Sequence, residues 1–290
     1  MTTSIAEAIL AGANLLRRAG VPEARREAGS LLSHVIGQER SFLITHADDS
    51  VTDNHVAILR DYLERRAAGE PLQYITGRQE FFGLDFEVTP AVLIPRPETE
   101  LLVEIGKKLI ADSSSAPFIC DVGTGSGCIA VTLLHELPTA RAVAVDISPS
   151  ALEVARRNAE RHSVNERIEF CVSDCFAALS AKNPEQSGFD LIVSNPPYVE
   201  ECALQGLQRE VREFEPREAL IAGADGLVII RRLLVDARKF LQHNGHLVFE
   251  ISFNQGEAVR ELINPKFWTL VDIFEDLQSI PRIVALQKHS

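Results

Sequence analysis

The sequence has few cysteines, few aromatic residues and too little positive charge to balance its acidic residues. Five of its 290 residues are cysteine, 6% are aromatic, and 29 Lys and Arg stand against 41 Asp and Glu, so the formal net charge is −12. A constitutive nucleic-acid-binding protein normally shows a basic footprint. The acidic balance therefore disfavours direct binding to nucleic acid, while an apolar content of 46% is typical of a globular protein.

The cysteines show no metal-binding or disulfide pattern. The sequence contains no Cys-x-x-Cys pair, and none of its eight histidines lies at a metal-ligand spacing beside a cysteine. We therefore expect reduced thiols in the core and no metal site. The cysteines are Cys120, Cys128, Cys171, Cys175 and Cys202.

Long hydrophobic runs are also missing. No apolar run approaches the ~20 residues that a membrane-spanning helix needs. Residues 1–19 lack the basic start and uninterrupted apolar core of a secretory signal, because Glu7 comes early and Arg17 and Arg18 come late. We expect a cytoplasmic monomer without a membrane partner.

The first 72 residues have a helical pattern. Ser4 can cap a first helix, and apolar residues at helical spacing predict further helices over residues 23–36 and 53–68. These segments predict a small helical bundle over residues 1–72.

Residues 73–97 have a different composition. Aromatic and β-branched residues surround Gly83, a pattern that favours a β-hairpin. Pro95 and Pro97 then force an extended connection. We therefore predict a hairpin linker over residues 73–97, followed by a separate domain over residues 98–290.

In this last region short apolar strands alternate with helical segments. Such alternation predicts a doubly wound, mostly parallel sheet of an α/β protein. The last two strands have no helix between them and are predicted to form an antiparallel hairpin at the edge of a seven-stranded, Rossmann-like sheet. The predicted strands cover residues 118–121, 141–146, 167–172, 189–194, 246–251, 268–274 and 282–286, and two of the predicted helices cover residues 150–161 and 225–241.

A glycine-rich segment, Asp121-Val122-Gly123-Thr124-Gly125-Ser126-Gly127-Cys128, follows the first strand and opens a helix. Its glycines would let backbone N–H groups face a ligand where the helix dipole is positive. A tight turn without a ligand is the alternative. The dinucleotide fingerprint needs a third glycine three positions after the second, where Cys128 stands, so the spacing is wrong for NAD.

Carboxylates follow the next two predicted strands. Asp146 could accept hydrogen bonds from both ribose hydroxyls of an adenosine, or it could merely belong to the start of the following helix. Asp174 could accept from an adenine amino group while its neighbour Cys175 covers the ring, or the two could form a simple turn.

The most specific segment is Asn195-Pro196-Pro197-Tyr198, directly after a predicted strand. Two prolines remove two donors and stiffen the loop, which leaves the Asn195 side-chain oxygen and the Pro196 carbonyl as acceptors for an NH₂ group. Two acceptors pulling on the N–H bonds of a planar amide favour the pyramidal form that can attack. Tyr198 could pack against the planar group. A proline-rich loop with a capping asparagine is the alternative.

These motifs together resemble the class I S-adenosylmethionine-dependent methyltransferases, specifically the glutamine-amide methyltransferases that modify peptide chain release factors. The resemblance covers nearly the whole chain. Besides the glycine-rich segment and Asn195 to Tyr198, it rests on Gly69-Glu70-Pro71-Leu72-Gln73-Tyr74-Ile75-Thr76-Gly77, Glu80-Phe81-Phe82-Gly83, Leu93-Ile94-Pro95-Arg96-Pro97-Glu98-Thr99-Glu100, Phe214-Glu215-Pro216-Arg217, Gly223 and Asp225-Gly226.

The resemblance implies a role for each motif. It implies that S-adenosylmethionine donates a methyl group to the glutamine amide nitrogen of a class 1 release factor, leaving S-adenosylhomocysteine, with no metal. The segment from Arg96 to Glu100 would help to shape the cofactor pocket. The implied substrate-binding residues are Asn195, Pro196, Pro197 and Tyr198, with Asn195 and Pro196 catalytic, and the implied cofactor-binding residues are Asp121, Gly123, Thr124, Gly125, Ser126, Gly127, Asp146, Asp174, Cys175 and Asn195.

The sequence departs from the family pattern where Ser252-Phe253 follows Glu250, since members often carry a glycine there, and where Ala222-Gly223 replaces a glycine pair.

Two other functions stay open. An adenine or cytosine amino methyltransferase would use the same Asn-Pro-Pro-Tyr segment, but the negative charge disfavours it. A non-catalytic binding module is the second alternative.

The N-terminal bundle is predicted to dock the protein substrate.

Overall fold

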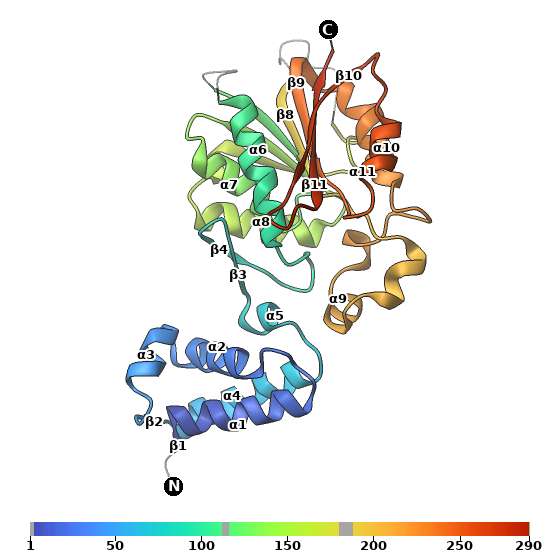
Figure 1. The fold of residues 1–290 in the computed structure, drawn as a ribbon. Helices are drawn as coiled ribbons and strands as arrows, with labels where there is room; N and C mark the ends of the chain where they lie inside the picture. Colours follow the sequence, from blue (N-terminus) through green and yellow to red (C-terminus); the bar gives the residue numbers. More distant parts are fainter. Residues whose placement is uncertain (1–2, 112–115, 180–187, 290) are drawn as a thin grey trace. The chain divides into compact units, whose positions relative to one another are not determined.

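The computed structural model describes residues 3–111, 116–179 and 188–289. The chain divides into two compact units (Figure 1). The first unit consists of Met1–Arg78 together with Gln208–Phe214, and the second of Gln79–Leu207 with Glu215–Ser290.

The first unit is helical, and its first helix begins where the sequence predicts. Ser4 and Glu7 form a capping box: the Ser4 hydroxyl accepts from the Glu7 amide at 3.2 Å, and Glu7 accepts from the Ser4 amide at 2.9 Å. Apolar faces of the helices bury a common core that includes Leu16, Leu31 and Leu32. The elements are β1 (Thr3–Ser4), α1 (Ile5–Arg18), α2 (Ala24–Ile36), α3 (Arg40–Thr45), β2 (Ser50–Val51), α4 (Asp53–Ala67), α5 (Leu72–Thr76) and α9 (Arg209–Phe214).

Helix α9 reaches this unit from far along the chain. The buried guanidinium of Arg66 pairs with Glu27 at 2.5 Å and with Glu210 of α9 at 2.9 Å. The sequence offers no sign of this arrangement, because α9 is short and its partners lie more than a hundred residues away. The structure therefore groups residues 208–214 with the N-terminal helices.

The second unit contains the predicted sheet. Within the described residues it has seven strands in the order β10-β11-β9-β8-β5-β6-β7, parallel from β9 to β7, with β11 antiparallel to both β9 and β10. The fold class and the antiparallel edge hairpin are thus confirmed. The strands are β5 (Phe118–Val122), β6 (Arg141–Asp146), β7 (Ile168–Val172), β8 (Phe189–Ser194), β9 (Leu241–Glu250), β10 (Trp268–Glu275) and β11 (Pro281–Lys288).

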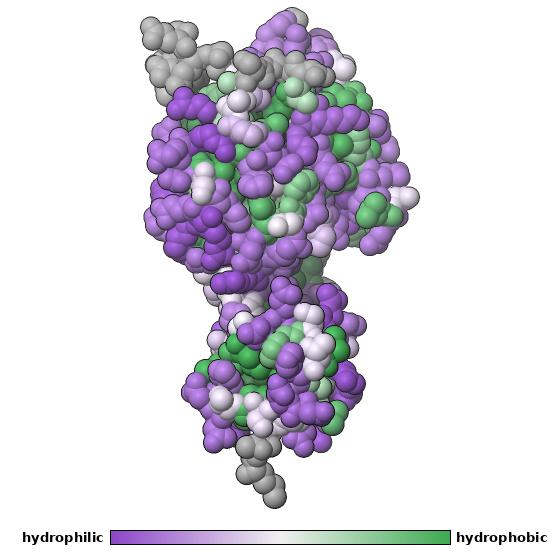
Figure 2. Space-filling view, turned by 90° about the vertical axis from the view of Figure 1, so that its left-hand side faces the viewer, coloured by the Kyte–Doolittle hydropathy of each residue, from purple (hydrophilic) through white to green (hydrophobic). Residues whose placement is uncertain are grey.

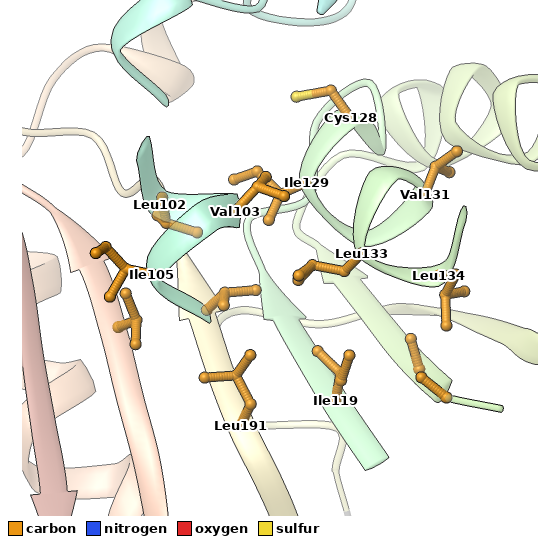
Figure 3. Close-up of a cluster of buried hydrophobic side chains, with 14 of the residues drawn as sticks. Leu102, Val103, Ile105, Ile119, Cys128, Ile129, Val131, Leu133, Leu134 and Leu191 are labelled. Carbon is orange, nitrogen blue, oxygen red and sulfur yellow. The ribbon is translucent and has the colours of Figure 1, made fainter. Parts of the chain in front are cut away.

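Helices cover both faces of this sheet (Figure 1). Alternate strand residues supply the two cores: Ile119 and Leu191 pack with α6 and α7 on one face (Figure 3), whereas Cys120 and Ile192 belong to the core beneath α10 and α11. Every residue of β8 is buried, as expected for a central parallel strand. The helices are α6 (Glu100–Ile110), α7 (Cys128–Glu136), α8 (Pro149–Arg161), α10 (Val228–Asp236) and α11 (Gly256–Leu262).

The predicted hairpin is present as β3 (Arg78–Phe81) and β4 (Leu84–Glu87). Phe81 and Phe86 are buried in the same core as α6 and α7, and the side chain of Asn158 on α8 accepts from the Glu87 amide at 2.7 Å. The hairpin therefore packs onto the second unit, although the sequence predicts it as a linker.

Two local expectations are wrong. The helix predicted over residues 225–241 is shorter, because Leu241 already pairs with Phe189 in the sheet and a 3₁₀ turn at Ala237–Lys239 ends the helical segment. The cysteines are free, as expected, but Cys202 is exposed and Cys171 half-buried, so they are not all core residues. No helix in the described ranges has the length and apolarity needed to cross a bilayer.

Candidate active site

A cavity of about 660 Å³ lies at the carboxyl ends of the parallel strands. Loops after β5, β6, β7 and β8 line it, as does the segment before α6. Ligands of open α/β sheets bind at this edge. Ten of the predicted site residues line the cavity: Gly123, Thr124, Gly125, Ser126, Asp146, Asp174, Cys175, Asn195, Pro196 and Pro197.

The glycine loop enters α7 with positive φ at Gly123, Gly125 and Gly127, at 75°, 55° and 81°. An added Cβ at Gly123 or Gly125 would meet open space, whereas at Gly127 it would lie 3.1 Å from Ala155 Cβ. The first two glycines thus leave room for a ligand and the third permits close packing of α7 and α8.

Four amide groups of this loop donate hydrogen bonds within the protein. Gly123 and Thr124 donate to Val145 O at 2.8 and 3.0 Å, and Gly125 donates to Asp146 Oδ2 at 2.9 Å. Gly127 donates to Thr124 O at 2.8 Å. These four N–H groups are therefore not available to a ligand, and Gly123 and Gly125 contribute open space. That other N–H groups of the loop face a ligand stays a prediction.

Asp146 ends β6 and lines the cavity. Its Oδ2 accepts from the Gly125 amide and its Oδ1 from the Ser148 amide, both at 2.9 Å. Burial raises the pKa of this carboxyl above its ordinary value, and these backbone hydrogen bonds oppose that rise. Each oxygen keeps a second lone pair, so the carboxylate can still accept from two hydroxyl groups.

Asp121 lies beneath the glycine loop and is outside the cavity lining. Its Oδ2 accepts from the Thr124 hydroxyl at 2.7 Å, and its Oδ1 has no hydrogen-bond partner among the described residues. Burial raises its pKa to about 7. The side chain thus anchors the loop from below, and Gly127 likewise lies behind the lining.

Asp174 and Cys175 follow β7 and line the cavity. The Asp174 carboxylate pairs with Arg232 at 2.8 Å, so an adenine amino group would have to share it with a guanidinium. Cys175 is buried and has φ 49°, a strained conformation of the kind found at functional sites.

Basic side chains cluster on α10 and the following turn, where nearby acidic residues or an aromatic ring neutralise or cover them. Arg231 pairs with Asp225 at 2.5 Å, and Lys239 pairs with Asp236 at 2.5 Å. The Arg238 guanidinium lies 3.9 Å from the centre of the Phe267 ring. With Arg232 held by Asp174, these side chains do not form a free phosphate-binding patch.

The Asn-Pro-Pro-Tyr loop is anchored at both ends. Before it, the Ser194 hydroxyl donates to Val122 O at 2.7 Å. Asn195 Nδ2 donates to Thr99 Oγ1 at 3.1 Å, and the Tyr198 hydroxyl donates to Glu250 Oε1 at 3.2 Å. Tyr198 is not among the residues that line the cavity, and the packing of its ring on the substrate stays a prediction.

The sequence predicted no individual role for two residues of this site, Thr99, which it placed only within the pocket-shaping segment from Arg96 to Glu100, and Glu250. Thr99 precedes α6 and is 2% exposed, and its hydroxyl donates to Glu250 Oε2 at 2.6 Å. Glu250 ends β9 and is 1% exposed. Burial raises its pKa to about 6, against the opposing effect of the Thr99 and Tyr198 hydrogen bonds. Glu250 could have been recognised in the sequence as a charged residue at the end of an apolar strand.

The sequence is similar to proteins of one named family over almost its full length. It is 44% identical over 273 residues to a release factor glutamine methyltransferase of Koribacter versatilis, covering 94% of each chain. It is 42% identical to the protein of the same name in Geobacter sulfurreducens, covering 93% of this chain and 91% of that one. The chain belongs to the release factor glutamine methyltransferase family.

Family models match two parts of the chain, and a solved structure shares its fold. Residues 7–77 match a family described as the PrmC N-terminal domain, and residues 113–268 match one described as a methyltransferase domain. A methyltransferase structure from Pyrococcus furiosus, 17% identical, aligns with a TM-score of 0.52 over 82% of this chain and 100% of that one. At that identity the similarity shows the fold alone.

The described ranges contain no group of three or more His, Cys, Asp or Glu side chains arranged to hold a metal ion. The polar residues that line the cavity are instead suited to binding hydroxyl and amide groups.

Proposed function

We propose that this protein transfers a methyl group from S-adenosylmethionine to the side-chain amide nitrogen of a glutamine in class 1 peptide chain release factors. One observation carries the proposal: a single cavity is lined both by the nucleoside-type carboxylate Asp146 and by the amide acceptors Asn195 and Pro196. Family membership supports the same reaction.

The cavity fits S-adenosylmethionine in size and chemistry. Its volume of about 660 Å³ lies within the ~300–1,000 Å³ of small-molecule sites. The free lone pairs of Asp146 suit two ribose hydroxyls, and the space above Gly123 and Gly125 suits the amino-acid end. When bound, this cofactor supplies an activated methyl group on a sulfonium.

The chain's own residues position the nucleophile. The Asn195 carboxamide and the Pro196 carbonyl accept the two N–H bonds of the glutamine amide, which hold its nitrogen in one orientation. Accepting both bonds favours a pyramidal nitrogen with an available lone pair. No strong base is needed, because the methylated nitrogen is acidic and loses its proton to water or to these acceptors.

Mass spectrometry tests the proposed reaction. Purified protein is incubated with S-adenosylmethionine and a class 1 release factor, and the peptides are analysed for one added methyl group on a glutamine. A release factor with that glutamine replaced by alanine is the control. Methyl transfer to an adenine- or cytosine-containing oligonucleotide instead would favour the nucleic-acid amino methyltransferase, and no transfer to any of these substrates would favour a binding module.

Asp146→Ala should weaken cofactor binding. A hydrogen bond to a charged group contributes about 1.5–3 kcal/mol, so loss of the carboxylate should raise the Kd for S-adenosylmethionine at least about tenfold in calorimetry. Asp61→Ala, at an exposed aspartate of the first unit, is the matched control. Equal affinity of both variants would place the ribose elsewhere.

We also propose that the first unit docks the release factor and that the protein acts as a cytoplasmic monomer. A glutamine side chain is too small to identify one protein, and a specific interface buries ~1,200–2,000 Å². The residues lining the cavity all belong to the second unit, which leaves the first without a catalytic role. Hydrophobic residues are visible on the surface of the N-terminal part in Figure 2.

The docking role predicts different effects on protein and peptide substrates. Ile44 and Leu10 of the first unit are 79% and 57% exposed. Ile44→Asp or Leu10→Asp should lower kcat/KM for intact release factor about tenfold, the effect of one lost apolar contact of about 1.4 kcal/mol, and leave a short glutamine peptide unaffected. Val271→Asp, on exposed β10, is the control. Equal losses on both substrates would mean that the unit only stabilises the fold.

A further inference from the structure

A hydrogen-bond relay runs from the cavity wall into the buried interior. It joins residues that are far apart in the sequence: Asn195 Nδ2 donates to Thr99 Oγ1 at 3.1 Å, and the Thr99 hydroxyl donates to Glu250 Oε2 at 2.6 Å. Asn195 and Thr99 line the cavity, and Thr99 and Glu250 are almost fully buried. The proposed reaction assigns no part to Thr99 or Glu250, so the relay is an additional feature of the site.

The direction of each hydrogen bond follows from the chemistry of the groups. An ionised carboxylate only accepts, so the single hydroxyl proton of Thr99 is directed at Glu250. The Thr99 oxygen can then only accept from Asn195. An acceptor at that place selects the NH₂ end of the carboxamide, although the two ends have nearly the same shape.

The second oxygen of Glu250 reinforces this direction. It accepts from the Tyr198 hydroxyl at 3.2 Å, and burial together with the neighbouring Glu250 raises the pKa of that phenol, which keeps its proton in place. Both carboxylate oxygens therefore receive a hydroxyl proton. Glu250 is an acceptor on both sides, and its Oε2 receives the Thr99 hydroxyl proton.

We propose that Thr99 is a positioning residue that holds the Asn195 carboxamide with its oxygen, not its nitrogen, available to the substrate amide. The inference rests on the proposed function, in which Asn195 must accept a hydrogen bond. A carboxamide turned by half a rotation would present NH₂ to the NH₂ of the glutamine, and two donors repel each other. Glu250 sets the direction of the Thr99 hydroxyl.

Substitutions at Thr99 test this assignment. Thr99→Val keeps the shape and removes the hydroxyl, so the amide of Asn195 loses the partner that selects its orientation. We expect kcat to fall about 10- to 100-fold on both release factor and glutamine peptide, since small misplacements of a reacting group cost up to ~100-fold. The Kd for S-adenosylmethionine should stay within about threefold. Thr99→Ser restores the hydroxyl and should restore kcat to within about threefold of the wild-type value.

Two controls separate positioning from stability. Thr132→Val removes the hydroxyl of another fully buried threonine, one without a hydrogen-bond partner among the described residues, and should leave kcat unchanged. If Thr99→Val does not fold, Thr99→Ala against Thr99→Ser provides a second comparison that differs by the hydroxyl alone.

The outcomes distinguish this inference from the proposed function. Wild-type transfer to the glutamine together with low kcat in Thr99→Val and recovery in Thr99→Ser supports positioning. Wild-type transfer with Thr99→Val within twofold of wild type overturns it, as does a Thr99→Ser variant as slow as Thr99→Val. Absence of transfer by the wild-type protein would overturn the proposed function itself.

Discussion

Asn195→Ala should abolish nearly all methyl transfer while leaving the cofactor bound. The side chain supplies one of two acceptors for the attacking NH₂ group, and removal of one preorganised polar contact of this kind lowers kcat about 10²–10³-fold. Because the Asp146 carboxylate and the glycine loop are unchanged, calorimetry should find an S-adenosylmethionine Kd within about threefold of wild type. The rate is measured as labelled methyl transferred to a glutamine peptide.

An exposed asparagine provides the comparison for this variant. Asn165→Ala, at an exposed position whose side chain donates to the neighbouring Glu166 carboxylate at 3.1 Å, should have wild-type turnover. Turnover of Asn195→Ala within about threefold of wild type would mean that Asn195 does not hold the reacting amide.

Gly226→Ala should be the most destabilising single methyl addition near the site. Gly226 has φ +69°, and an added Cβ would lie 2.3 Å from the carbonyl oxygen of Tyr198 and 2.8 Å from Gln255 Nε2. That nitrogen donates to Gly226 O at 3.1 Å and to Tyr198 O at 3.3 Å. A methyl group at this point would push apart the substrate loop and the turn before α10.

The expected size of this effect combines two costs. A left-handed conformation costs a non-glycine residue about 1–2 kcal/mol, and an inserted carbon in a packed region about 1–3 kcal/mol. For a unit of this size, about 3 kcal/mol lowers the melting temperature by about 6–12 °C. We also expect slower transfer, because the displaced carbonyl belongs to the Asn-Pro-Pro-Tyr loop.

A second glycine isolates the clash. Gly83 has φ +74° with nothing within 4 Å of an added Cβ, so Gly83→Ala should show the conformational cost alone, with a decrease of about 2–8 °C and unchanged turnover. Equal melting temperatures for the two variants in calorimetric scans would show that the contact between Gly226 and Tyr198 is not tight.

Features that depend on local pattern could be predicted from the sequence alone. Alternating apolar segments and helical spacing predicted the sheet and its antiparallel edge, because strands buried on both faces must be apolar along their whole length, as in β8. The sequence also predicted that Ser4 caps the first helix, since a capping residue acts on an amide only three positions away. Asp146 and Asn195 were predicted to share one cavity, because parallel strands end at the same edge of a sheet.

Which polar groups already have a partner within the protein could not be predicted from the sequence and follows from the folded arrangement. The pairing of Asp174 with Arg232, the loop amides satisfied by Val145 and the relay from Asn195 through Thr99 to Glu250 each join residues that are distant in sequence. The grouping of α9 with the N-terminal helices has the same origin. A hydrogen bond depends on positions within a few tenths of an ångström, and the packing of the whole unit, not a residue's neighbours along the chain, sets those positions.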